Sequence, residues 1–320
     1  MTGLARTMLR LHRPALIVWG VFVAAALVCL VRLTEITAGA ARAEAASCPA
    51  HQGFCGSMWA TLDYSEPMGW VSTCVYYSFW AVAAWAGGAL IGGELESGTA
   101  RLAWTQGVSP ARWLAAKLTV PALAIALGGA LFIPVYRWAW SANRDLMGDD
   151  WTFADVFADR GPAVVAYGLC ALAVGALTAL VLRRSLPAMG VSVAVMVVLN
   201  QFLERHREDF WPAVTRTSTK AFEVSDSVWQ VENGTVTRGH RVEGLDHTAC
   251  HGSPGEIKRC LDAMGIDGYY AIYHPRSHFW PMNLVETGIL LAVAALATVL
   301  AFRLLKRHTG AAAGHQELTV

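Results

Sequence analysis

Two pairs of cysteines stand close together in polar segments of the chain. Cys48 is followed by Cys55, and Cys250 is followed by Cys260. Neighbouring cysteines on an oxidising side of a membrane commonly form disulfides. We therefore predict one disulfide within each pair. The remaining three cysteines lie in apolar runs and are Cys29, Cys74 and Cys170.

The second cysteine pair has an alternative interpretation as a metal site. His247, Cys250, His251 and Cys260 crowd together in the segment DHTACHGSPGEIKRC. Imidazole and thiolate groups are the preferred ligands of zinc. This spacing matches no standard zinc module, so the disulfide is the preferred interpretation and no metal site is predicted.

A few polar and aromatic side chains within apolar runs are candidates for a substrate path. Glu286 lies near one end of the last run, and a carboxylate inside a membrane is costly and usually functional. It also lies only a turn from the boundary, where it would reach water. Tyr76, Tyr77 and Trp80 could line the same path or simply pack in the core. The apolar runs hold no converging set of acids, His and Cys, so no catalytic residue is predicted and an intramembrane enzyme is disfavoured.

The composition and the length of the apolar runs predict an all-α integral membrane protein. Hydrophobic residues make up 55% of the 320 residues, charged residues only 15%, and the mean hydropathy is +0.39. An apolar helix of about 20 residues crosses a bilayer. We predict six spans, at residues 14–31, 71–93, 118–140, 163–182, 187–203 and 284–305. Basic residues are spread among the connections rather than gathered in one patch, so a nucleic-acid partner is not expected.

The basic residues also predict the orientation of the chain. Placing both termini in the cytosol satisfies the positive-inside rule at every short connection and puts both cysteine pairs outside. The residues placed inside are Arg6, Arg10, Arg13, Arg101, Arg112, Lys117, Arg183, Arg184, Arg303, Lys306 and Arg307. We expect a multi-pass protein of the cell membrane with both termini cytosolic.

The polar connection 94–117 between the second and third spans contains signals for a separate short helix. Gly98 can end the preceding helix, Thr99 can cap a new one, and Gly107 can end that one in turn. Ser109 followed by Pro110 is typical of the start of the next helix. We predict a two-turn helix between the glycines.

The same connection resembles the first cytosolic loop of ABC-2 type transporter permeases. The resemblance lies in Glu94-Leu95-Glu96-Ser97-Gly98-Thr99, in Arg101-Leu102-Ala103-Trp104-Thr105-Gln106, in Ser109, and in Arg112-Trp113-Leu114-Ala115-Ala116-Lys117. Gly93 and Pro110 stand where that family often has basic residues. The match is close over this loop and extends loosely, through the order of the spans, to the whole chain.

This resemblance implies a permease subunit of an ATP-driven exporter. The short helix would couple the membrane part to a separate ABC ATP-binding subunit, which would hold ATP and magnesium. A second permease half, identical or different, would complete the assembly. The chain itself has no GxxxxGK[ST] phosphate-binding loop, so no cofactor is expected in it. The implied coupling residues are Glu94, Glu96, Gly98, Thr99, Arg101, Leu102 and Trp104.

Two alternatives remain open from the sequence. Leu102, Trp104 and Trp113 are apolar residues in a polar loop, so they could lie among lipid headgroups instead of contacting a partner. The protein as a whole could also be a membrane sensor or structural protein whose extracellular segment binds a ligand without transport.

The remaining segments complete the predicted organisation. Residues 1–13 have one apolar and one basic face and predict a cytosolic helix lying on the membrane. Residues 141–162 are acidic with interspersed aromatics and suggest an outer surface helix. Residues 204–283 predict an extracellular segment with short strands and turns at Asn233-Gly234 and Asp267-Gly268. Residues 306–320 form a cytosolic tail.

Overall fold

The computed structural model describes residues 10, 12–46, 57–147, 151–220, 222, 224–225, 227–243 and 250–316. The chain divides into two units. A helical unit is built from the residues before Arg205 and after Met282, and a second unit spans Arg205–Met282. Cys48, Cys55 and most of the predicted N-terminal helix lie outside the described residues.

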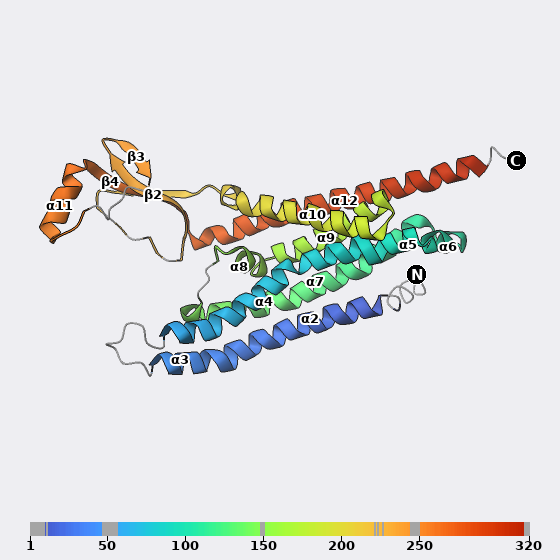
Figure 1. Cartoon of the computed structure of the whole chain (residues 1–320), viewed down its shortest axis with the longest axis horizontal. Helices are drawn as coiled ribbons and strands as arrows, with labels where there is room; N and C mark the ends of the chain where they lie inside the picture. Colours follow the sequence, from blue (N-terminus) through green and yellow to red (C-terminus); the bar gives the residue numbers. More distant parts are fainter. Residues whose placement is uncertain are drawn as a thin grey trace. The chain divides into compact units, whose positions relative to one another are not determined.

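Among the described residues, six helices are long and apolar enough to cross a membrane, which agrees with the predicted number of spans. Helix α9 begins and ends at the predicted residues, and the others are longer than their apolar runs. Their bounds are α2 Arg13–Arg32, α4 Ser57–Trp85, α7 Pro110–Ala142, α9 Ala163–Leu182, α10 Ser185–Arg205 and α12 Phe279–Gln316 (Figure 1).

The first two spans extend well beyond their apolar runs. A π-helical segment, Leu33–Thr37, joins α2 to α3 (Ala38–Ala46), whose alanines favour helix. Helix α4 continues through a second π-helical segment, Ala86–Gly92, into the short α5, Gly93–Glu96. The outer loop expected between the first two spans is therefore largely helical in its described part.

Small residues allow α9 and α10 to pack closely against the second π-helical segment. A Cβ on Gly175 would lie 2.7 Å from Cβ of Ala86, and a Cβ on Gly87 would lie 2.8 Å from the carbonyl oxygen of Ala188. Real side chains do not tolerate such distances. Membrane helices use small residues in this way to bring their backbones together.

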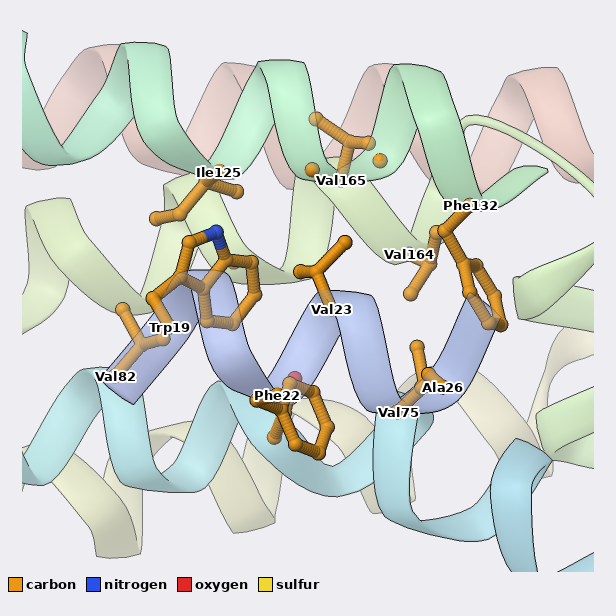
Figure 2. A pocket seen from close by; sticks show the side chains of 14 residues that line it. Trp19, Phe22, Val23, Ala26, Val75, Val82, Ile125, Phe132, Val164 and Val165 are labelled. Atoms are coloured by element: carbon orange, nitrogen blue, oxygen red, sulfur yellow. The ribbon is translucent and has the colours of Figure 1, made fainter. Parts of the chain in front are cut away.

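Helices α2, α4, α7 and α9 meet in a tightly packed apolar joint. Figure 2 shows Trp19 and Phe22 of α2 with Ile125 of α7 and Val165 of α9 around it. Trp19 Nε1 also donates a hydrogen bond of 3.0 Å to the carbonyl of Ala124. The joint encloses a volume of only about 30 Å³. That is room for about one water molecule, so the helices are closed together here.

The connection between α7 and α9 differs from the predicted outer surface helix. It holds a short 3-10 helix, Arg144–Leu146, and the six-residue α8, Ala154–Asp159. Trp151, Phe157 and Asp159 are fully buried. The acidic residues suggested a solvated face, but Ser72 of α4 donates a hydrogen bond of 3.1 Å to Asp159 and so supports its burial.

In its described residues the second unit is a four-stranded antiparallel sheet with helix α11, so this segment contains the short strands that were expected and the all-α description holds for the helical unit alone. The strand order is β1-β4-β2-β3. The strands are β1 Val214–Ser218, β2 Trp229–Thr237, β3 His240–Glu243 and β4 Ile266–His274, and the helix is α11 Pro254–Ala263.

Both predicted turns of this unit lie inside strands. Gly234 is in the middle of β2, where a Cβ would lie 2.9 Å from the Tyr270 ring, so its glycine allows close strand approach. Asp267 and Gly268 belong to β4. The hairpin between β2 and β3 instead turns at Arg238 and Gly239, whose φ angles are 51° and 77°. Two left-handed residues in succession suit a tight hairpin turn.

A disulfide joins Cys250 to Cys260, as the sequence predicted for this pair. Their Cα atoms are 5.7 Å apart, which is within the usual range for a disulfide. The bond connects the segment before α11 to the helix itself. Among the described residues no group of three or more His, Cys, Asp and Glu side chains is placed to hold a metal ion.

Candidate functional site: the loop between the second and third spans

The loop contains a separate short helix between two left-handed glycines. Helix α6, Thr99–Thr105, follows Gly98, whose φ is 77°, and Gly107 after it has a φ of 90°. Left-handed φ angles are easy only for glycine. Gly98 occupies the N-cap position that the sequence suggested for Thr99, while the Thr99 hydroxyl donates a 3.3 Å hydrogen bond to the Glu94 carbonyl. Helix α5 is thus separated from helix α6 by a left-handed residue at Gly98.

The start of the third span follows its predicted signals. Ser109 is the N-cap of α7, and its hydroxyl accepts a hydrogen bond of 3.4 Å from the Arg112 backbone N–H. Pro110 takes the first helical position, where its missing N–H costs nothing. The loop therefore runs from one rigid helix to another through α6.

Glu94 links the end of the second span to the third. Its Oε1 lies 2.5 Å from Nζ of Lys117, and its Oε2 accepts a hydrogen bond of 3.1 Å from Nε1 of Trp113. The Lys117 side chain is fully buried, whereas that of Glu94 is 23% exposed. A buried ammonium needs such a partner because its desolvation is otherwise very costly.

His12 completes this buried group from the N-terminal side. The Lys117 ammonium donates to its Nε2 at 3.0 Å, and the imidazole lies edge-on to Trp85. Burial lowers the pKa of His12, and the Lys117 charge lowers it further. A neutral imidazole can accept a hydrogen bond from the lysine ammonium. The three side chains hold the N-terminal segment, the loop and the third span together.

Glu96 anchors the other side of the loop to the turn between α9 and α10. Its Oε2 accepts hydrogen bonds from the backbone N–H of Ser185 at 2.8 Å and from the Ser185 hydroxyl at 2.5 Å. Ser185 is the first residue of α10, so the carboxylate also serves the free N–H groups of that helix end. Both predicted coupling glutamates therefore have partners within this chain.

Helix α6 has one buried and one exposed side. Ala100 is fully buried, and Trp104 packs edge-on against Trp113 with ring centres 5.7 Å apart. Arg101 is exposed, and Leu102 is 59% exposed. Arg101 and Leu102 therefore lie on the exposed side of a short helix that follows the two bonded glutamates, Glu94 and Glu96.

The predicted substrate-path residues fall on two sides of α4. Tyr76 is fully buried and donates a hydrogen bond of 2.8 Å to Glu204 of α10, while Asn200 donates to Tyr76 at 2.5 Å. Glu286 is also fully buried and accepts a 2.7 Å hydrogen bond from Tyr167 of α9. Because Asn200 also lies 3.4 Å from the Tyr167 hydroxyl, a continuous polar network joins Glu204 to Glu286.

Tyr77 and Trp80 continue from Tyr76 as a row of aromatic side chains. The ring centres of Tyr76 and Tyr77 are 4.7 Å apart, and those of Tyr77 and Trp80 are 4.5 Å apart. Tyr77 also lines an apolar cavity of about 670 Å³ between α2, α4 and α7, together with Trp19, Phe22 and Trp85. The aromatic side chains therefore lie between the polar network and this cavity.

Several residues of the network could not be identified from local sequence. Glu204 is at the end of the fifth span, where a charge looks like a helix terminus. Tyr167 is an isolated aromatic in a small-residue helix. The spacing of Asn200 and Glu204, four residues apart, was a usable signal, because such residues share a helix face. Tyr76 was itself a candidate from the sequence. Its contact with Asn200 joins residues 124 apart in the chain, so no local signal could predict that pairing.

A further buried acid, Asp159, was also missed. It lies at the end of α8 with both carboxylate oxygens shielded, and among the described residues only its Oδ2 has a hydrogen-bond partner. Burial raises its pKa well above the usual value, and the nearby Asp155 raises it further. Asp159 therefore holds its proton more tightly than an exposed aspartate does.

Comparison with known proteins identifies the family of the chain. The model of the family described as "ABC-2 membrane transporter related" matches residues 19–207, which is more than half of the 320 residues and includes the loop and the first five spans. The comparison with curated proteins gave no match, and neither did the comparison with solved structures. Six membrane-compatible helices and this family match agree with each other. The chain belongs to the ABC-2 membrane transporter related family.

Proposed function

We propose that this chain is the transmembrane permease subunit of an ATP-driven ABC-2 type exporter, and that α6 docks it on a separate ATP-binding subunit. The observation that carries the proposal is the construction of the loop. The seven-residue helix α6 follows the left-handed Gly98 and exposes Arg101 and Leu102. The residues just before it are held by hydrogen bonds of Glu94 to Lys117 and of Glu96 to Ser185.

A docking element has to pass movements of the ATP-binding subunit on to the membrane-spanning helices, and the contacts of this loop suit that role. The Glu94 carboxylate bonds to α7 through Lys117, and the Glu96 carboxylate bonds to α10 through Ser185. Movement of α6 would therefore act on the third and fifth spans together. Transport would follow as a shift between two arrangements of the spans, driven by nucleotide binding in the partner.

The remaining parts of the assembly are proposals on the same basis. ATP and magnesium would be held by the partner, and a second permease half, identical or different, would complete the substrate path. The network from Glu204 to Glu286 is our candidate for the polar part of that path. Both termini and α6 would face the cytosol of the cell membrane, and the sheet unit would be extracellular.

Co-purification with an ATP-binding subunit tests the proposal. We expect an ABC ATP-binding subunit to co-purify with the intact chain from its own cells and to lose that association when Arg101 and Leu102 are both replaced by Ala. Leu123→Ala is a matched control, because Leu123 is 57% exposed on α7 away from the loop. Failure of the intact protein to bind any ATPase, or equal binding by the double variant, would contradict the docking role.

The same variants separate docking from a lipid-facing role of α6. If the apolar residues of the loop only rest among headgroups, Trp104→Ala would disturb the protein more than the change at Arg101, with no specific effect on the ATPase. A ligand-binding sensor without transport would show neither ATPase association nor substrate flux.

A further inference from the structure

A pocket of about 670 Å³ lies beside α6 at the ends of three membrane-spanning helices. Its walls come from the loop, from the start of α7 and from the ends of α9 and α12. Leu180 of α9, Leu305 of α12 and Trp104 of α6 supply apolar surface, whereas Arg101, Arg183 and His308 stand around it. Apolar walls with two arginines and a histidine at one rim match the two chemical parts of an anionic amphiphile.

The basic groups of this pocket lack counter-charges. Among the described residues Arg101, Arg183 and His308 make no salt bridge, while the neighbouring carboxylates Glu94 and Glu96 are already engaged with Lys117 and Ser185. Arg183 follows the last residue of α9 and has a left-handed backbone with a φ of 55°. The charges of the two arginines therefore meet no carboxylate within the described part of the chain.

We propose that this pocket binds an anionic phospholipid, with the phosphate near Arg101, Arg183 and His308 and the upper acyl chains against Leu180, Leu305 and Trp104. Its place at the ends of α7, α9 and α12 puts it at the depth where membrane headgroups meet acyl chains. Anionic lipids concentrate on the cytosolic leaflet and attract basic groups there. Only the choice of leaflet rests on the orientation in the proposed function.

Such a lipid would contact α6 directly. It would fill the space between the docking helix and the ends of two spans, and so stiffen the loop in the position that the glutamates already define. We therefore expect lipid binding to stabilise the chain on its own, before any ATPase is present.

The test uses the purified full chain without an ATPase. Retention of phosphatidylglycerol and of phosphatidylcholine is compared by native mass spectrometry, alongside the thermal unfolding midpoint at increasing phosphatidylglycerol. We expect selective retention and a rising midpoint. The double change Arg183→Gln and His308→Gln should weaken binding by about fivefold or more, as expected for the loss of basic groups at a membrane surface.

Arg184→Gln is the matched control, because Arg184 is the adjacent exposed arginine and does not line the pocket. Glycerol phosphate without acyl chains tests whether a free phosphate suffices, and we expect it to have no effect. The proposal is overturned if phosphatidylcholine is retained equally, if Arg184→Gln weakens binding as much as the double change, or if glycerol phosphate gives the whole stabilisation. If the double change leaves lipid retention unchanged but abolishes co-purification with an ATPase in a separate experiment, the pocket belongs to the protein partner instead.

Discussion

Nζ of Lys117 lies 2.5 Å from Oε1 of Glu94, which joins the third span to the end of the second beneath the short helix α6. Lys117 is fully buried and also donates to His12. The ion pair therefore fixes the start of the loop against α7. A substitution that removes one of the two charges should disturb the loop even where the side chain keeps its size.

Removing Glu94 alone should lower the free energy of unfolding more than removing both Glu94 and Lys117. Glu94→Gln leaves the Lys117 ammonium buried without a counter-ion, and we expect it to destabilise the protein by about 3 kcal/mol. Lys117→Met should cost less, because Glu94 is 23% exposed and can be hydrated. The double variant should recover part of the loss, since the buried charge is gone. Thermal unfolding in detergent measures all three, and losses that simply add would contradict the coupling.

Gly98 should be the position where a single substitution does most damage to the loop. A Cβ there would meet no atom within 4 Å, so the cost of Gly98→Val is entirely that of its left-handed φ of 77°. For a residue other than glycine the left-handed conformation costs about 1–2 kcal/mol. Valine would avoid this cost if the preceding helix continued through position 98, and the break before α6 would then be lost. We expect the protein to insert normally while ATPase binding and substrate flux fall.

Two further variants make this result interpretable. Gly98→Asn should be less severe, because Asn tolerates the left-handed region. Gly20→Val adds the same side chain to an exposed helical glycine with free space around it. Normal ATPase binding and flux in Gly98→Val would remove the loop from the coupling mechanism.

The spans and the break in the loop could be predicted from the sequence because their signals are local. A run of apolar residues of bilayer length defines a helix whatever it packs against, and Ala163–Leu182 was placed to the residue. Gly98, Gly107, Ser109 and Pro110 act through their own backbone preferences. Such signals survive without knowledge of the rest of the fold.

The partners of the site could not be predicted because they are distant in the chain. Glu96 appeared to be free for a basic partner, yet it bonds to Ser185, 89 residues away. Asp159 looked solvated until Ser72 was placed beside it. Asn233-Gly234 has the composition of a turn, but close packing against Tyr270 in the sheet requires the glycine in a strand. In each case a tertiary contact overrides a local preference.

Asp159 should make the protein less stable as the pH rises. Its pKa in the folded protein is raised by burial, whereas an unfolded Asp has a pKa of about 3.9. As the pH increases above that value, the unfolded state loses a proton that the folded state keeps. Stability therefore falls from about pH 4 until the folded pKa is passed. Thermal unfolding midpoints across this range should show the decline.

The control variants for Asp159 isolate its proton. Asp159→Asn keeps the size and the hydrogen bond from Ser72 but does not titrate, so its profile should be flatter. Asp63→Asn changes an exposed acid of the same helical unit and should leave the decline in place. An identical profile in Asp159→Asn and the parent protein would show that Asp159 is not the group responsible.

Glu286 should affect transport more than folding. Its side chain is fully buried in α12, accepts the Tyr167 hydroxyl at 2.7 Å, and connects through Asn200 to Glu204. Glu286→Gln retains an acceptor oxygen of similar size and position, so the hydrogen bond from Tyr167 can persist. The carboxylate itself is lost. Because a carboxylate within a membrane span is costly and usually has a role, we expect normal abundance with reduced flux.

Two companion variants decide what the carboxylate does. Tyr167→Phe removes the hydrogen bond but keeps the acid, so it should reduce flux less than Glu286→Gln if the charge or proton of Glu286 is what matters. Thr119→Ala changes an exposed polar side chain of α7, whose hydroxyl donates to the Ala115 carbonyl of the same helix, and should leave flux unchanged. Substrate flux in proteoliposomes is compared with membrane abundance for each protein. If Glu286→Gln lowers abundance and flux together, Glu286 supports the packing of α9 and α12 and does not belong to the substrate path; unchanged flux at normal abundance removes any role for its carboxylate.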